Sequence, residues 1–319
     1  MKVNLKSAKK FETEFVHYAG KRVRELKSTF KEIVQRLDGE AVHDFRRATR
    51  QLQTIVDACG IRRPSRAVTK TLRRLRRSRH ALSAWRDSDV LLAELRKARR
   101  KARTKGERQA WAEIAERIVK QRRLALKKFS RKHKSLKLKA IANKAKALVK
   151  DRVQSEPLMD NLRRLLERSW NNWTGAIDDF VGTPAAAELH EVRIKTKTLR
   201  YAIELSQKFY PDRELETASE WLKGIQDRVG AWHDELMLGR VALETFSETP
   251  RDPSAIKVIR DTKEKEIAMA ESSRNYILSI RKMKDYQRLK RVLAASVYAM
   301  TDGKGPRDLE SESITGPIQ

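Results

Sequence analysis

The segment LHEVRIKTKTLRYAIEL at residues 189–205 has a counterpart, VHDFRRATRQLQTIV, at residues 42–56. Both segments place apolar residues at helical spacing, and His190 follows His43 by 147 residues. The same offset matches Asp44 with Glu191, Arg46 with Arg193, Arg50 with Lys197 and Leu52 with Leu199. We therefore interpret the chain as an internal duplication in which each copy carries His-acid-x-Arg-x-x-x-(Arg or Lys) on a helix.

The common register continues beyond these segments without a gap. Further matches at the same offset are Pro64 with Pro211, Leu75 with Leu222, Leu82 with Val229, Trp85 with Trp232, Asp87 with Asp234 and Leu91 with Leu238. A constant offset over such a length is hard to explain by chance. We take the two tryptophans as core residues because they lie on the side of the leucines.

The composition indicates a soluble, helical and strongly basic protein. Lys and Arg total 72 against 42 Asp and Glu, which gives a net charge of +30 and favours polyanionic partners such as nucleic acid, an anionic membrane or a phosphate polymer. The single cysteine, Cys59, permits no internal disulfide. No run of 18 apolar residues and no signal peptide is visible, so we expect a cytoplasmic protein.

Helical periodicity extends over most of the chain, and no convincing period-two pattern appears, so the prediction is an all-α fold. The predicted helices span approximately 8–37, 39–60, 64–86, 88–104, 107–130, 157–181, 184–209, 212–232, 234–247 and 254–299, the last with a break. A Lys-rich connector at 131–154 joins the halves. We predict domains at 1–150 and 151–300 and a disordered tail at 301–319.

On a helical wheel the first motif separates cations from apolar residues. His43, Arg46, Arg47 and Arg50 share one face, and the second copy places His190, Arg193, Lys197 and Arg200 together in the same way. Such cations lie about 5–6 Å apart and repel one another unless carboxylates or a bound anion neutralise them. Few acids share the face, which favours a bound anion.

The next segment reinforces the pattern in the first half. A second basic row there follows helical spacing and comprises Arg66, Lys70, Arg73, Arg77 and His80. The runs at 96–105 and 117–139 are typical of solvated helix faces. Only the duplicated histidine face repeats the same residue types at the same spacing in both halves.

The two motifs resemble the CHAD domain, the conserved histidine α-helical domain, over about residues 8–300. The resemblance rests on His43-x-x-Arg46-x-x-x-Arg50 and on the second motif, and is supported by the segments at 85–87 and 230–234. Gln51 and Gln53 stand where the family usually has arginine, so either the first face is weaker or Arg47 and Arg76 compensate.

The resemblance implies two tandem four-helix bundles related by pseudo-twofold symmetry, with a shared basic groove or pore. It also implies binding of inorganic polyphosphate and association with polyphosphate granules. The expected polyphosphate-binding residues are His43, Arg46, Arg47, Arg50, Arg73, Arg76, Arg77, His190, Arg193, Lys195, Lys197 and Arg200. We expect Asp87 and Asp234 to hold arginines in place, and protonated histidines to tighten binding below about pH 6.5.

Catalysis and metal binding find little support in the sequence. There is no Gly-rich phosphate loop, nucleophile-elbow serine or paired set of carboxylates for acid–base chemistry. No H-x-H or H-x-x-x-H pair is present, and the neighbouring arginines would repel a divalent cation. We expect neither an enzyme nor a cofactor nor a protein-bound metal.

Non-specific binding of RNA by the same basic surfaces is the main alternative, because charge alone does not distinguish one polyanion from another. Proteins that bind single strands usually place aromatic residues among their cations, whereas here the aromatic residues lie elsewhere. We therefore expect at most weak nucleic-acid binding at low salt. A scaffold role for the acidic tail and for the basic helix at 281–291 has no signature of its own.

Overall fold

The computed structural model describes residues 5–155, 157–247 and 252–302, and these residues contain helices and no strand. The prediction of an all-α fold is therefore confirmed. The α-helices are α1 (Leu5–Arg36), α2 (Gly39–Gly60), α3 (Arg66–His80), α4 (Ser83–Lys101), α5 (Lys105–Lys132), α6 (Leu138–Ser155), α7 (Leu158–Gly182), α8 (Ala186–Gln207), α9 (Arg213–Phe246), α10 (Pro253–Ser279) and α11 (Lys284–Asp302). Short 3₁₀ turns, η1 (His133–Leu136) and η2 (Ile280–Lys282), precede α6 and α11.

The motif helices α2 and α8 form because each buries the apolar side of its sequence. Asp38 caps α2 by accepting a hydrogen bond from the Glu40 backbone N–H at 2.9 Å. Val42 and Phe45 in α2, like Val192 and Leu199 in α8, are fully buried. The cationic sides of both helices are thereby turned away from the core.

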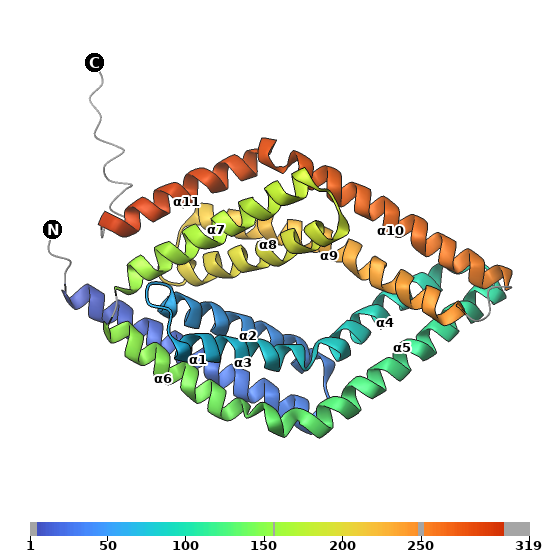
Figure 1. Cartoon of the computed structure of the whole chain (residues 1–319), viewed down its shortest axis with the longest axis horizontal. Coiled ribbons are helices and arrows are strands. Elements are labelled where there is room, and N and C mark those ends of the chain that lie inside the picture. Colours follow the sequence, from blue (N-terminus) through green and yellow to red (C-terminus); the bar gives the residue numbers. More distant parts are fainter. Residues whose placement is uncertain (1–4, 156, 248–251, 303–319) are drawn as a thin grey trace, which may run out of the picture.

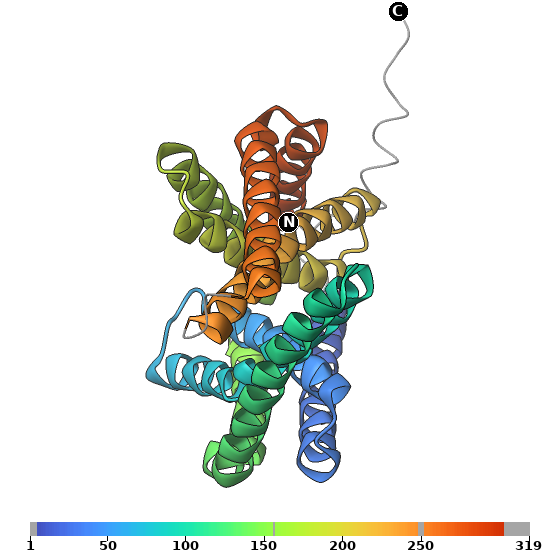
Figure 2. The same cartoon turned by 90° about the vertical axis from the view of Figure 1, so that its right-hand side faces the viewer.

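Two groups of helices make up the main body. In the first group α1, α2, α3 and α6 pack together, and in the second α7, α8, α11 and part of α9 do so. Figure 1 and Figure 2 show the first group below and the second above. A single buried core runs through both groups and contains Trp85, Trp173 and Trp232. The segment at 131–154, expected as a connector, supplies α6, which packs against α1 and α2.

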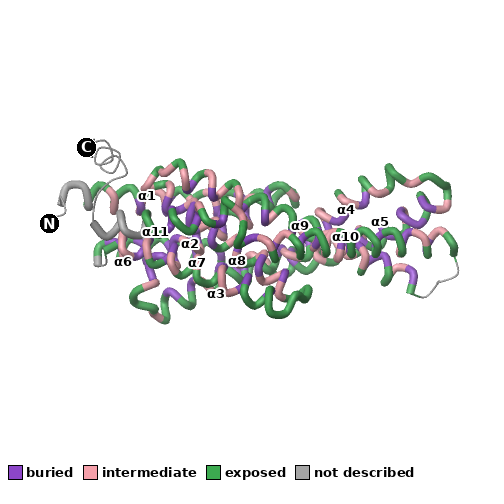
Figure 3. Tube along the Cα trace, turned by 90° about the horizontal axis from the view of Figure 1, so that it is seen from above, coloured by how far each residue is buried: buried purple, intermediate pink, exposed green. Residues whose placement is uncertain are grey.

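A second core lies at the other end of the elongated molecule, where α4, α5 and α10 extend away from the main body (Figure 3). Its largest buried residues include Trp111 from α5 and Phe246 from α9. Both cores therefore draw on both sides of the predicted boundary at residue 150. The predicted tail at 301–319 lies almost wholly outside the described residues, and α11 ends at Asp302.

Several predicted helix boundaries are wrong. The helix predicted at 64–86 begins at Arg66, after the N-cap Ser65, and ends at His80, with Leu82 before the start of α4. In contrast, α9 continues through His233, where a break was expected. No proline interrupts this stretch, and α9 buries Trp232 in the first core and Leu238 in the second, so one continuous helix serves both.

The helix bounds follow the sequence offset closely. Residues 39–60 of α2 shift by 147 onto 186–207, which are the bounds of α8. At the same offset, α5 falls on α10 and η1 falls on η2. The pair α3 and α4 corresponds to the single helix α9.

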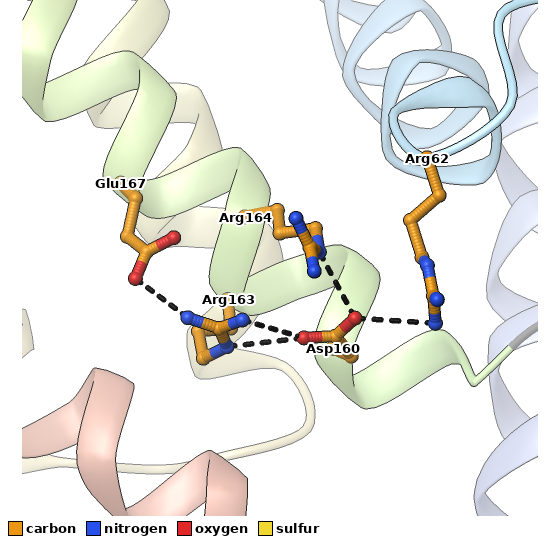
Figure 4. A network of polar contacts seen from close by, with 5 residues as sticks. All are labelled: Arg62, Asp160, Arg163, Arg164 and Glu167. Carbon is orange, nitrogen blue, oxygen red and sulfur yellow. Dashed lines mark hydrogen bonds and ion pairs between the residues drawn. The ribbon is translucent and has the colours of Figure 1, made fainter.

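An ion-pair network connects the two groups of the main body (Figure 4). The Asp160 carboxylate of α7 contacts Arg62 Nη1, in the loop after α2, at 3.3 Å. The same carboxylate accepts hydrogen bonds from Arg163 and Arg164, and Arg163 Nη1 also donates to Glu167 at 2.7 Å. Burial alone would raise the pKa of Asp160, but these hydrogen bonds outweigh it and lower that pKa.

Candidate anion-binding cavity

A cavity of about 1080 Å³ lies between α2, α4, α8, α9 and α10. Among the described residues, ten Lys or Arg line it against five Asp or Glu, so its wall is strongly basic. The cationic residues are Arg46, Arg47, Arg50, Arg86, Lys97, Arg193, Lys197, Arg200, Lys223 and Lys265. The structure thus brings cations of both motif helices to one cavity, as the repeated pattern predicts.

The arginines of α2 and the cations of α8 act on one another electrostatically. Burial, followed by the charges of Arg193, Arg50 and Arg46, lowers the pKa of Lys197 to about 7. Burial is also the largest cause of the lowered pKa of Arg50, with Arg193 and Arg200 contributing. Such a cluster is unfavourable without a counter-charge, and a polyanion would relieve the repulsion.

Several guanidinium groups at the cavity retain unused hydrogen-bond donors. The Nε atoms of Arg193 and Arg200 are buried and have no hydrogen-bond partner among the described residues. Arg200 also donates from Nη1 to Glu204, and Arg46 donates to the Ser83 hydroxyl at 2.8 Å. Because an unpaired buried donor is costly, phosphate oxygens are suitable partners for these groups.

Asp87 and Asp234 are separated by the same 147-residue offset as the motif histidines, and both line the cavity. Burial raises the pKa of Asp87, and the charges of Arg46, His233 and Arg193 oppose that rise. Asp234 and Asp87 in turn favour the charged form of Arg193. This proximity fits the expectation that the two aspartates hold arginines in place.

The two motif histidines occupy different environments. His43 lines the cavity and is exposed, with Nδ1 at 3.4 Å from the Asp44 carboxylate. His190 is not among the lining residues, and its ring packs against that of His233, which does line the cavity, at a centroid distance of 5.1 Å. Burial, His233 and Arg193 lower the pKa of His190, so its protonation requires a pH below the expected 6.5.

Four other predicted binding residues lie outside the cavity. Arg73, Arg76 and Arg77 are exposed on α3, and Lys195 forms an ion pair with Glu191 at 3.0 Å. Val68, Leu75 and Ser78 form the buried side of α3, and the helical period places Arg73 and Arg77 opposite that side.

Sequence reasoning also missed cations that contribute to the site. Arg86, Lys97, Lys223 and Lys265 line the cavity, and Lys265 pairs with the buried Glu235. Arg79 borders the arginines of α2: burial and the charges of Arg50 and Arg46 lower its pKa to about 9. Of the four lining cations, only Arg86 was recognisable, because it belongs to the Trp-Arg-Asp segment.

Aromatic residues are scarce at the cavity wall. Trp85 and Trp232 are buried in the main core, which confirms their expected packing role. Apart from histidines, the lining residues in the described part of the chain include one aromatic side chain, Tyr201, whose ring lies under the Arg200 guanidinium at 5.0 Å. Base stacking along this wall would therefore have little support.

Within the described ranges, no group of three or more His, Cys, Asp or Glu side chains is arranged to hold a metal ion. None of the described helices combines the length and apolar character that a bilayer crossing requires.

Comparisons with known proteins define the class to which this fold and site belong. Residues 12–243 match the CHAD domain, and the chain belongs to that family. The CHAD domain from the plant Ricinus communis superposes with a TM-score of 0.59 at 18% identity, covering 91% of this chain and 92% of that one. PptA from Streptomyces chartreusis superposes with a TM-score of 0.64 at 18% identity, covering 86% and 99%. The search among curated proteins gave no match. The two solved structures show a shared fold.

Proposed function

We propose that this protein binds inorganic polyphosphate in the basic cavity between α2 and α8. The observation that carries the proposal is the convergence of Arg46, Arg50, Arg193, Lys197 and Arg200 on one cavity, with buried guanidinium donors that lack partners. A linear polymer with a charge on every unit would neutralise the cations of α2 and those of α8 together. The family to which the chain belongs and the resemblance of its motifs lead to the same ligand.

In the proposed complex, the arginines donate charge-assisted hydrogen bonds to phosphate oxygens, and Lys197 acts as a point charge. Phosphate is favoured over a nucleic acid because the wall offers cations without a set of stacking platforms. We also propose that the protein binds the polymer without cleaving it. In the cell, such a protein would collect in the cytoplasm at polyphosphate granules.

A direct binding titration tests the proposal. The double variant Arg46→Gln with Arg193→Gln removes one guanidinium from each motif helix, and each loss should cost about 1.5–3 kcal/mol. The affinity for long-chain polyphosphate should fall roughly 100-fold or more. The control, Lys282→Gln with Lys284→Gln, removes the same charge from exposed positions outside the cavity. Equal affinities of the two double variants would contradict the proposal.

The absence of cleavage is tested separately. Polyphosphate incubated with the parent protein, with and without Mg²⁺, should release no orthophosphate above the rate of the polymer alone. Release that disappears in the Arg46→Gln, Arg193→Gln variant would show that the cavity is an active site.

A further inference from the structure

The exposed side of α3 carries a continuous row of basic residues that the cavity does not use. We call it the α3 basic row, and its members are Arg66, Lys70, Arg73, Arg77 and His80. All five are exposed, and α3 contains no acidic residue. Within the described residues, none of the five forms an ion pair. The row runs over 14 residue steps, which corresponds to roughly 21 Å of helix.

The C-terminal end of this row adjoins the cavity. Arg46, on the cavity wall, donates from Nη1 to the Arg79 carbonyl oxygen at 3.4 Å and to Ser83 just beyond α3. His80 follows Arg79 in the chain and lies within the field of Arg46 and Arg50, whose charges contribute, after burial and Arg79, to its lowered pKa. From this junction α3 leads back to its N-terminal end (Figure 1), and the rest of the row lies along that helix.

The second copy has no equivalent row. At an offset of 147 the corresponding residues on α9 are Arg213, Thr217, Glu220, Gly224 and Asp227. Four of these are exposed, yet they include two acids and one cation. The two halves therefore share the cavity arginines but differ in the surface that leads away from them.

We infer that a polyphosphate chain filling the cavity continues onto the α3 basic row, so that the protein discriminates between long and short chains and holds the polymer on the side of the first half. This inference rests on the proposed function, since it assigns a second part of the binding site to the same ligand. Unpaired and closely spaced exposed cations are suited to a polymer that releases counterions on binding.

The test compares two ligands and three variants. The α3 variant carries Lys70→Gln, Arg73→Gln and Arg77→Gln, all at exposed positions. The control carries Lys282→Gln, Lys284→Gln and Lys290→Gln, which are exposed on η2 and α11. The third variant is Arg46→Gln with Arg193→Gln. Each is titrated with long-chain polyphosphate and with tripolyphosphate at several salt concentrations.

The α3 variant should bind long-chain polyphosphate roughly five- to tenfold more weakly than the control variant. Its salt dependence, the slope of log K against log salt, should fall by about 2, as expected for three lost phosphate contacts at about 0.7 each. Its affinity for tripolyphosphate should equal that of the control.

Other outcomes overturn the inference in distinguishable ways. If the α3 variant binds long chains as the control does, while the cavity variant loses both ligands, the α3 basic row has no role and the proposed function stands. If the cavity variant keeps both ligands, the proposed function itself fails. A parallel titration of the α3 variant and its control with single-stranded RNA separates the two polyanions. If the α3 variant binds this RNA more weakly than the control but binds long-chain polyphosphate equally well, the row is a nucleic-acid surface.

Discussion

Arg46 on α2 and Arg193 on α8 line the same cavity, although 147 residues separate them in the chain. Burial is the largest cause of the lowered pKa of Arg46, and the charge of Arg193 contributes to the lowering. Arg46 and Arg193 occupy the same position in their motifs, and the charge of Asp87 opposes the lowering of the pKa of each arginine. The cavity thus holds like charges together that only a counter-charge would stabilise fully.

Removing the Lys197 charge should stabilise the free protein. Its folded pKa of about 7 lies below the ordinary 10.5, so the unfavourable free energy is fully present below pH 7 and fades as the pH rises toward 10.5. Lys197→Met should raise the free energy of unfolding by on the order of 1–3 kcal/mol at pH 6, and by less than half of that at pH 9. Urea unfolding at both pH values measures the difference.

Lys284→Met is the control for that comparison because Lys284 is exposed. It should change the free energy of unfolding by less than about 0.5 kcal/mol. A Lys197→Met protein that is no more stable than its parent at pH 6 would mean that the amine is well solvated or paired.

Polyphosphate binding should take up protons near neutral pH. A bound polyanion raises the pKa of Lys197 back toward its ordinary value, so a site that is partly deprotonated at pH 7.5 becomes charged. Isothermal titration calorimetry in buffers of different ionisation enthalpy should show the uptake, and Lys197→Gln should reduce it. A binding enthalpy that does not depend on the buffer would contradict this assignment.

His190 should steepen the pH dependence of binding only under acidic conditions. Its pKa is lowered by burial, His233 and Arg193, so it gains charge only below its ordinary value of 6.5. Polyphosphate affinity measured from pH 5 to 8 should rise less steeply toward the acidic end of this range in His190→Gln than in the parent. His17→Gln, at an exposed position on α1, is the control. An unchanged slope in His190→Gln would exclude this role.

The Asp160 network should stabilise the contact between the two groups of the main body. Because its partners lower the pKa of Asp160, the stabilisation is present above its ordinary value of 3.8 and is lost as the pH falls through the lowered pKa. Asp160→Asn should therefore lose about 1 kcal/mol at pH 7, and the difference from the parent should be smaller at pH 3 than at pH 7. Glu14→Gln, exposed on α1, should lose nothing measurable at either pH.

Much of the fold followed from local pattern. The apolar rows of α2 and α8 and the repeated register predicted helices whose bounds, 39–60 and 186–207, differ little from expectation. The continuity of α9 could not be predicted in this way, because it depends on Trp232 and Leu238 reaching different cores. A helical wheel shows which side of a helix is apolar but not which neighbouring helix covers it.

The site residues also fall into those that local pattern predicts and those that depend on tertiary packing. The motif cations Arg46, Arg50, Arg193, Lys197 and Arg200 do line one cavity, because their faces oppose the buried side of each helix. On α3 we predicted Arg73 and Arg77 at the site and missed Arg79, although a helical wheel separates them. Arg79 lies beside the buried Leu75, whereas Arg73 and Arg77 lie opposite that residue. Lys265 lies on α10 and reaches the cavity only through tertiary packing, for which the sequence carries no local signal.

The most direct test of the central claim is a competition titration at near-physiological salt. Labelled long-chain polyphosphate is displaced by unlabelled polyphosphate, single-stranded RNA or duplex DNA at matched phosphate concentration. The parent is compared with a variant in which His43, Arg46, His190 and Arg193 are changed to Ala, and thermal unfolding confirms that the variant is folded. We predict strong preference for polyphosphate in the parent and loss of that binding in the variant. Equal displacement by RNA, or a folded variant that binds as tightly as the parent, would contradict the account.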